Sequence, residues 1–420
     1  MHHYEIPQCH NYKTSKPRNL ETSKPETRNQ KPETRNQKLE TRNQKLRNQK
    51  LPPENPMKET TIIVTAALCL TCVAVNAETQ KPVTEGPLDD YAFLVKHMPE
   101  KDRGVVSEEY LRKNVALAQE ARRTAPWRDT ITDEIFREYV LPYSSIGEEV
   151  DDWRPLFREK FWPLVKNCKT TGEAVQLINS KIWKTLNVRY NTKRDKPDQS
   201  PFHSMRIHMA SCTGLAILEI DVYRACGIPA RFTGCNWTPI PGNHSWVEYY
   251  DNGKWHFFND AEDDKLAKPD ESWFASYAAQ ADETSPRTRI YAARWSANGT
   301  WFWCTWRGGN APSSVPADDV TESYRRFRKN LPKASVAFVA RNEEGKRVPV
   351  QLRLLAPGSG KVMAEGTTYD ESHDMNDHMI ISLPERTMAI IQAETPDGMY
   401  HTIGRTDFEK KQKLVEIKVK

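Results

Sequence analysis

A long apolar run that begins at Ser211 constrains the fold of this chain more than any other segment. Ser211 is a residue type that caps helix N-termini, and Gly227 with Pro229 ends the helix, because glycine tolerates positive φ and proline cannot continue it. The pattern therefore predicts a buried helix with Cys212 in its first turn. Its apolar residues fall on one wide face: Leu215, Ile217, Leu218, Ile220, Val222, Tyr223 and Ala225.

Cys212 has the local setting of a reactive thiol. The unpaired amides and the positive end of the helix dipole favour the thiolate at a helix start. A neighbouring amide is also placed to receive an oxyanion that develops on a substrate. The competing interpretation is a small buried apolar residue, which is the state of most free cysteines. We predict that Cys212 is a nucleophile, because Cys168, Cys226, Cys235 and Cys304 have no comparable setting.

Residues 244–259 predict a β-hairpin that begins at a histidine. The segments HSWVEYY and KWHFFN flank Asp251, Asn252 and Gly253, and Asn-Gly is the strongest two-residue hairpin signal. His244 then lies at the entrance of the first strand, with Trp246 on the same face. A half-buried strand histidine is the simpler alternative. The order Cys212, His244 favours a nucleophile followed by its base.

These parts together resemble the transglutaminase-like superfamily over roughly residues 170–310. The resemblance rests on the cysteine at a helix start, the GIPAR turn that ends at Arg231, the strand that begins His-x-Trp, and a third residue on the next strand. It implies a papain-like α+β core in which Cys212 attacks a carboxamide or peptide carbonyl. His244 would take the thiol proton and later protonate the departing amine.

The resemblance also bears on the reaction and its requirements. It is to bacterial members, many of which are thought to be hydrolases, so hydrolysis of peptides, including cell-wall peptides, is favoured over crosslinking. The chemistry needs no cofactor. The core has no acidic cluster that would argue for the calcium dependence of animal transglutaminases.

Two adjacent residues compete to orient His244. In the family the orienting residue stands four positions after the tryptophan of the second strand, which maps from Trp255 onto Asn259, where Asp is more usual. Asp260 follows one position later and would stabilise an imidazolium better through its charge. Strand alternation sends the two side chains to opposite faces, so only one can hold the ring unless a bulge intervenes. Both stay candidates, and register favours Asn259.

Tryptophans support a rival function of another class. Four of them stand between Trp295 and Trp306, and aromatic platforms of this kind stack on sugar rings. The alternative is therefore a catalytically inactive glycan-binding or cell-wall-binding protein. The favoured interpretation is that the rings fill the core and line the cleft beside Cys212. Trp237, Trp246 and Trp303 are the candidate cleft residues.

The first 77 residues have the character of segments outside the mature fold. Residues 1–56 repeat TRNQK and are too poor in apolar residues to bury a core, so we expect a non-native or disordered leader. Residues 57–77 have the layout of a secretory signal peptide, with an apolar run too short for a comfortable membrane span. A lipoprotein anchor at Cys72 is disfavoured because Thr71 stands where a small residue is usual. We expect an exported, periplasmic or extracellular protein.

Charge and cysteine content narrow the partners. Residues 1–56 hold 12 Lys and Arg against 6 Glu, so the net charge of +5 belongs to the leader and a nucleic-acid partner is excluded. Five cysteines follow residue 77, and an odd number leaves at least one thiol unpaired, although Cys226 could pair with Cys235. After residue 77 no paired Cys or His motif fits a structural zinc site. The HDMNDH motif at 373–378 could hold a divalent cation, but we expect a solvated loop and no metal.

The pattern after the signal peptide divides into three regions. Residues 78–168 are predicted to be helical, although Pro155 and Pro163 should break WRPLFREKFWPLV into short pieces. Residues 169–317 form the predicted core, which would bind a peptide or protein substrate. Residues 318–420 contain short strands between Gly, Pro and Asp turns, which predict a small antiparallel β-sandwich with a structural or targeting role.

Overall fold

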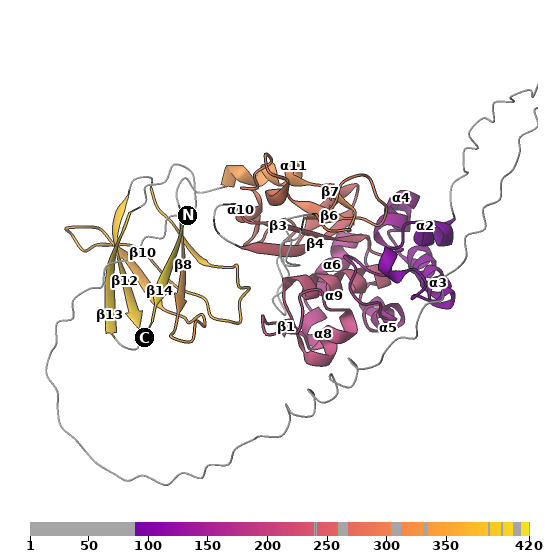
Figure 1. The fold of residues 1–420 in the computed structure, drawn as a ribbon, viewed down its shortest axis with the longest axis horizontal. Helices are drawn as coiled ribbons and strands as arrows, with labels where there is room; N and C mark the ends of the chain where they lie inside the picture. The colour runs from indigo at the N-terminus through magenta and orange to yellow at the C-terminus, as the bar shows by residue number, and fades with distance from the viewer. Residues whose placement is uncertain are drawn as a thin grey trace, which may run out of the picture. The chain divides into compact units, whose positions relative to one another are not determined.

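The computed structural model describes residues 89–419, apart from 239, 241, 259–267, 304–311, 331–334, 385–386, 396–397 and 406–412. The predicted leader and signal peptide lie outside these residues. The described part combines helices with sheets (Figure 1), so the predicted mixture of α and β structure is confirmed. None of its helices has the length and apolar character of a membrane span.

Helices occupy most of the described residues between 89 and 225. Side chains cap two of these helices: the Ser107 hydroxyl accepts a hydrogen bond from the Tyr110 amide, and the Thr132 hydroxyl accepts one from the Ile135 amide, both at 3.2 Å. The α-helices are α2 Asp90–Lys96, α3 Glu108–Thr124, α4 Asp133–Tyr139, α5 Trp153–Val165, α6 Thr171–Asn179, α7 Ile182–Leu186, α8 Pro201–Ile207 and α9 Cys212–Ala225, with 3-10 turns η1 Glu100–Asp102 and η2 Arg128–Thr130.

The prediction that prolines divide α5 is wrong. Trp153–Val165 is one helix with both prolines in it. Pro155 is its third residue, where the backbone N–H has no partner within the helix, so the missing donor costs nothing there. Pro163 stands in the last turn, and burial of Phe157, Phe161 and Val165 offsets the one hydrogen bond that it removes.

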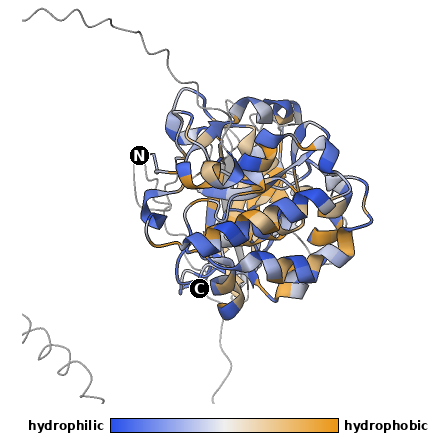
Figure 2. Ribbon diagram, turned by 90° about the vertical axis from the view of Figure 1, so that its right-hand side faces the viewer, coloured by the Kyte–Doolittle hydropathy of each residue, from blue (hydrophilic) through white to orange (hydrophobic). Residues whose placement is uncertain are grey.

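The predicted helix after Ser211 is confirmed as α9, which begins at Cys212 and ends before Gly227. Gly227 has φ +77°, and a Cβ there would lie 2.7 Å from the carbonyl oxygen of Ala121 in α3. Glycine is therefore required both by the backbone conformation and by the close approach of α3. Helix α9 belongs to the same hydrophobic core as residues of α3, α5 and α6. Figure 2 shows hydrophobic residues gathered behind helices whose outer faces are hydrophilic.

Helix α9 packs on a five-stranded antiparallel sheet of order β5-β4-β3-β6-β7. The predicted hairpin is confirmed: Asp251 pairs with Lys254 across a two-residue turn in which Asn252 and Gly253 both have positive φ. The strands are β3 Ala230–Asn236, β4 Asn243–Asp251, β5 Lys254–Phe257, β6 Tyr291–Ala293 and β7 Ala317–Asp319, and a separate parallel pair joins β1 Arg189–Tyr190 to β2 Met209–Ala210.

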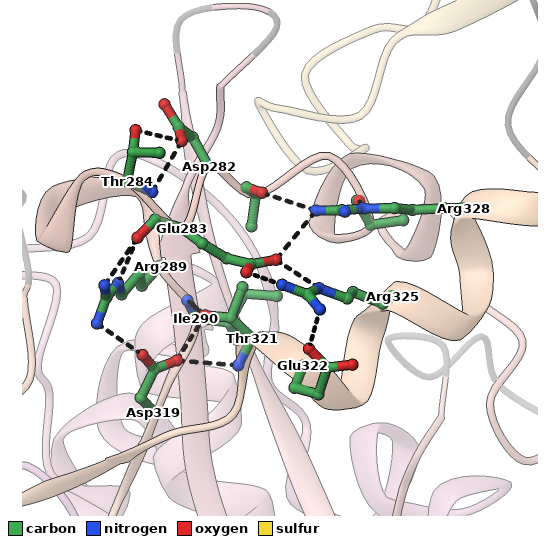
Figure 3. Close-up of polar contacts among 12 residues, drawn as sticks. Asp282, Glu283, Thr284, Arg289, Ile290, Asp319, Thr321, Glu322, Arg325 and Arg328 are labelled. Carbon is green, nitrogen blue, oxygen red and sulfur yellow. Dashed lines mark hydrogen bonds and ion pairs between the residues drawn. The ribbon is translucent and has the colours of Figure 1, made fainter.

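Short helices and an ionic network lead from this sheet to the C-terminal strands. The helices are α10 Ala275–Ala278, η3 Pro286–Thr288, α11 Thr321–Tyr324 and η5 Arg325–Asn330. Glu283 accepts hydrogen bonds from Arg325 and Arg328, and its carbonyl oxygen accepts two from Arg289 (Figure 3). Arg289 also pairs with Asp319 of β7 at 3.1 Å. The network fastens α11 and η5 to the loop after α10.

Two sheets follow, of order β10-β9-β12-β13 and β11-β8-β14. The expectation of wholly antiparallel pairing is wrong, because β14 runs parallel to β8. These are the last and first strands of the region, so the connection between them is long enough for parallel pairing. The strands are β8 Ser335–Arg341, β9 Gln351–Leu355, β10 Val362–Thr367, β11 Met379–Ser382, β12 Met388–Thr395, β13 Gly398–Arg405 and β14 Lys413–Lys418. Buried residues of β8, β9, β11 and β12 share one hydrophobic core.

Candidate active site

Cys212 is the first residue of α9 and is half-buried. The first intrahelical hydrogen bond runs from the Leu215 amide to the Ser211 carbonyl at 2.9 Å, so the preceding amides of the first turn have no acceptor within the helix. The Thr213 hydroxyl lies 3.4 Å from the hydroxyl of Ser245 in β4. The start of α9 is therefore held against the strand entrance that carries His244.

His244 is the second residue of β4, and its side chain is fully buried. The ring is surrounded by aromatic side chains, with ring centroids at 4.6 Å for Trp273, 4.9 Å for Phe274, 5.9 Å for Trp246 and 6.1 Å for Trp237. A cage of this kind keeps water from the imidazole and restricts how the ring can turn. It also disfavours the charged ring unless an anion compensates for the lost solvation.

A hydrogen-bonded chain fixes β4 just beyond His244. The indole of Trp246 donates to the Tyr324 hydroxyl at 2.7 Å, and that hydroxyl donates to Glu248 at 2.6 Å. Arg231, the cross-strand neighbour of Glu248, donates to the same carboxylate at 2.7 Å. The chain is buried, so its members lock the register of β3 and β4 and thereby the position of His244.

An anion is supplied by Asp374, which the sequence analysis placed in a solvated loop. That prediction is wrong, because Asp374 is buried, as are Asn376 and His378 of the same HDMNDH motif. The Asp374 Oδ2 lies 3.6 Å from Nδ1 of His244. This distance makes an ion pair but exceeds the usual range of a hydrogen bond. Asp374 lies in the C-terminal region, for which the sequence predicted only a structural or targeting role.

The HDMNDH motif contacts two strands of the core, β4 at Asn243 and β1 at Tyr190. Asn376 donates to Oδ1 of Asp374 through its backbone amide at 2.8 Å and its side chain at 3.2 Å, and its own Oδ1 accepts from the Asn243 amide at 3.4 Å. A Cβ at Gly242 would lie 2.5 Å from that same oxygen, so only glycine permits the approach. The Met375 amide donates to the Tyr190 hydroxyl at 2.6 Å.

The charge state of Asp374 follows from these partners. Burial on its own raises the pKa of the carboxyl, but His244 and the two donors of Asn376 outweigh burial, so the pKa is lowered below its ordinary value. Asp374 is therefore ionised at neutral pH.

The three groups form one cluster. A ring nitrogen of His244, the sulfur of Cys212 and a carboxylate oxygen of Asp374 all lie within 4.8 Å of one another. Oδ2 of Asp374 has no hydrogen-bond partner among the described residues, although its side chain is only 6% exposed. The structure thus brings the predicted Cys212 and His244 together and adds a carboxylate.

The other predicted site residues have different fates. Asn259 and Asp260 lie outside the described residues. Trp237 and Trp246 are buried in contact with His244, and Trp246 packs in the core with Phe274. Trp303 is half-buried and packs against the main hydrophobic core. None of the residues that form this core belongs to the cluster of Cys212, His244 and Asp374.

The remaining described cysteines, Cys168, Cys226 and Cys235, are free thiols, so the possible pairing of Cys226 with Cys235 is absent. Burial raises the pKa of the Cys226 thiol and that of the Cys235 thiol to about 12. Neither is therefore an activated nucleophile at neutral pH.

Comparison with known proteins identifies the core. The model of the transglutaminase-like superfamily matches residues 162–259, a segment that contains Cys212 and His244 and ends at Asn259. A search of curated protein sequences found no match.

Two solved structures can be named among those that are similar. A "putative cysteine protease" from Cytophaga hutchinsonii is 21% identical over 40% of this chain and 58% of its own length, with a TM-score of 0.22. Red sea bream transglutaminase is 10% identical over 67% of this chain and 65% of its own length, with a TM-score of 0.29. The chain thus spans less than two thirds of either protein. Residues 162–259, about a quarter of the chain, are therefore similar to the transglutaminase-like superfamily.

Proposed function

We propose that this protein is a thiol enzyme that cleaves or transfers acyl groups of peptides or carboxamides, with Cys212 as nucleophile and His244 as base. The observation that carries the proposal is the cluster itself: a cysteine at a helix start lies within 4.8 Å of a buried histidine nitrogen, inside the segment that matches the superfamily. If Cys212 were only a small core residue, nothing would require its sulfur to lie close to a ring nitrogen of His244.

The proposed reaction begins with transfer of the Cys212 proton to His244. The thiolate then attacks the substrate carbonyl carbon, and the carbonyl oxygen takes the electron pair as an oxyanion beside the amides of the first turn of α9. When the tetrahedral species collapses, the carbon–nitrogen bond breaks and the imidazolium returns its proton to the departing amine. A thioester at Cys212 remains.

The fate of this acyl-enzyme defines the reaction. Water would release an acid, which makes the protein a peptidase or amidase, and an amine would make a new amide. We favour an exported enzyme that hydrolyses peptides, including cell-wall peptides. This preference rests on the resemblance to bacterial hydrolases and on the layout of residues 57–77 as a signal peptide.

Two groups are proposed to assist His244. Asp374 contributes a negative charge that stabilises the imidazolium formed in the first step. Asn259 or Asp260 would hold the other side of the ring and fix its tautomer. The rival sugar-binding role has less support than the sequence suggested, since Trp246 and Trp295 are buried and hydrogen-bonded within the core, although Trp301 is 38% exposed.

Turnover of a peptide-amide library tests the proposal. Cys212→Ala and His244→Ala should each lower the rate about 10³-fold or more, because losing either member of such a unit costs nearly as much as losing both. Thermal unfolding should show that both variants remain folded, and Cys168→Ala is the matched control that keeps its rate. Release of a free acid rather than incorporation of an added primary amine would support hydrolysis. Retention of most of the rate by His244→Ala would show that the base is misassigned.

A further inference from the structure

The position of Asp374 is unusual for a group that only orients a catalytic histidine. Such a group contacts the ring nitrogen that faces away from the nucleophile, so the ring separates the carboxylate from the sulfur. Here the carboxylate oxygen, the sulfur and the ring nitrogen all lie within 4.8 Å of one another. The carboxylate therefore shares one small space with the thiol.

The distances within the cluster fit three ligands of one metal ion better than a hydrogen bond between His244 and Asp374. The 3.6 Å between Nδ1 of His244 and Oδ2 of Asp374 is too long for a hydrogen bond. Two nitrogen or oxygen ligands of a tetrahedral zinc ion, each about 2.1 Å from the metal, lie about 3.4 Å apart. A sulfur ligand at about 2.3 Å lies about 3.6 Å from such a nitrogen. The nitrogen and the oxygen already lie close to this spacing, and the sulfur, which lies within 4.8 Å of both, would move to about 3.6 Å from them.

Burial and charge point the same way. The Asp374 side chain is 6% exposed, its Oδ2 has no hydrogen-bond partner within the described part of the chain, and this atom is directed at the cluster. A thiolate at Cys212 would bring a second negative charge into the same space. One divalent cation neutralises both charges, which makes the buried pair favourable.

We propose that Cys212, His244 and Asp374 bind one Zn²⁺ ion through the thiolate, an imidazole nitrogen and a carboxylate oxygen. The ligand types select the metal: thiolate and imidazole suit zinc, whereas calcium and magnesium require a shell of oxygens. Half-exposure of Cys212 leaves a fourth position for water. If the proposed function holds, bound zinc occupies the nucleophile and keeps the enzyme inactive until the metal is removed.

Metal binding by the full-length chain tests this directly. The chain is stripped with a chelator, and Zn²⁺ uptake is measured by competition with a chromogenic chelator. His2, His3, Cys9 and His10 near the N-terminus give a background that all variants share, so the result is read as a difference between variants. Wild-type protein should hold one equivalent more than Cys212→Ala, and Asp374→Asn should bind that equivalent at least tenfold more weakly.

Matched variants and a spectrum separate the outcomes. Asp370→Asn changes a carboxylate of the same loop whose side chain is 49% exposed, and Cys168→Ala changes a cysteine outside the cluster, so both variants should bind zinc like wild type. Co²⁺ in wild-type protein should show thiolate-to-cobalt charge-transfer absorption, which requires no variant to fold. Equal uptake by wild type and Cys212→Ala, or no such absorption, would overturn the zinc site. Zinc binding without peptide turnover would instead refute only the proposed function, and turnover insensitive to zinc would refute only the metal site.

Discussion

His244 has two opposing influences at the scale of a single residue. The aromatic rings around it penalise the imidazolium, and the ionised Asp374 at 3.6 Å favours it. Since the proposed reaction passes through an imidazolium, the carboxylate lowers the free energy of that step. Without Asp374, His244 would still lie beside Cys212, but its protonation would cost more free energy.

Replacement of Asp374 tests this balance. In chelator-treated protein, Asp374→Asn should lower the turnover rate roughly tenfold to a hundredfold, because a charge is lost while the shape is kept. The rate should depend differently on pH in this variant, which a merely structural role would not produce. Asp370→Asn, on the same loop but with a half-exposed side chain, should retain the wild-type rate. Equal rates for both variants would show that the charge of Asp374 does not assist His244.

A second prediction at this scale concerns which residue, Asn259 or Asp260, orients the ring of His244. Asn259→Ala and Asp260→Ala should differ sharply in turnover, since adjacent residues of a strand face opposite ways and only one can reach the ring. We expect the larger loss from Asn259→Ala. Small and equal losses would mean that neither residue orients the imidazole.

Sequence reasoning could predict Cys212 and His244 as neighbours but not Asp374. The first two stand in local patterns, a helix start and a hairpin entrance, that any reader of the chain can recognise. Asp374 reaches the site through a contact such as that between Asn243 and Asn376, which are 133 positions apart. The HDMNDH motif can be recognised in the sequence, but no local pattern predicts which strand a distant loop will contact.

At the scale of elements, the sequence was most informative where backbone conformation depends on one residue. Gly227 and the Asn252-Gly253 turn fixed the end of α9 and the hairpin β4–β5 in advance. The prediction for α5 was wrong because one of its prolines lies in the first turn and the other in the last turn, where a helix tolerates proline. Position within the element decides the cost of a proline.

Two glycines separate conformational cost from steric cost. Both Gly227 and Gly253 have positive φ, but a Cβ at Gly253 would have no neighbour within 4 Å, whereas one at Gly227 would lie 2.7 Å from a backbone carbonyl. Gly253→Ala should therefore lower the free energy of unfolding by about 1–2 kcal/mol. Gly227→Ala should cost about 3 kcal/mol or more, because α3 must also move. Denaturant unfolding measures both, and equal losses would contradict the close packing of α3 on the end of α9.

At the scale of the whole molecule, a core and a C-terminal β region meet at the candidate site. The sequence predicts short strands in this C-terminal region, but it does not predict that β8 pairs with β14 in parallel. Pairing between the first and last strands of a region depends on the whole topology, which local patterns do not contain.

Acid should weaken this part of the molecule through His378. Burial lowers its pKa to about 4, the charges of Arg347 and Arg341 add to the effect, and its Nδ1 donates to the Asn376 carbonyl at 2.8 Å. The unfolded chain takes up this proton near its ordinary pKa of 6.5, so the contribution to stability is present above pH 6.5 and is lost as the pH falls towards 4. The loss amounts to about 3 kcal/mol at most.

Chemical unfolding between pH 7 and 4 checks the His378 prediction. The difference in unfolding free energy between wild type and His378→Gln should fall by up to about 3 kcal/mol over this range, because glutamine does not titrate. A difference that stays constant with pH would show that His378 is not the group responsible.

The most direct test of the central claim is the rate at which iodoacetamide labels each cysteine of the folded, chelator-treated protein near neutral pH, with the labelled positions identified by mass spectrometry. We predict fast labelling of Cys212 that His244→Ala slows at least tenfold, while Cys226 and Cys235 stay unlabelled because burial raises their pKa to about 12. Slow labelling of Cys212, or labelling that His244→Ala leaves unchanged, would contradict the assignment of these two residues as nucleophile and base.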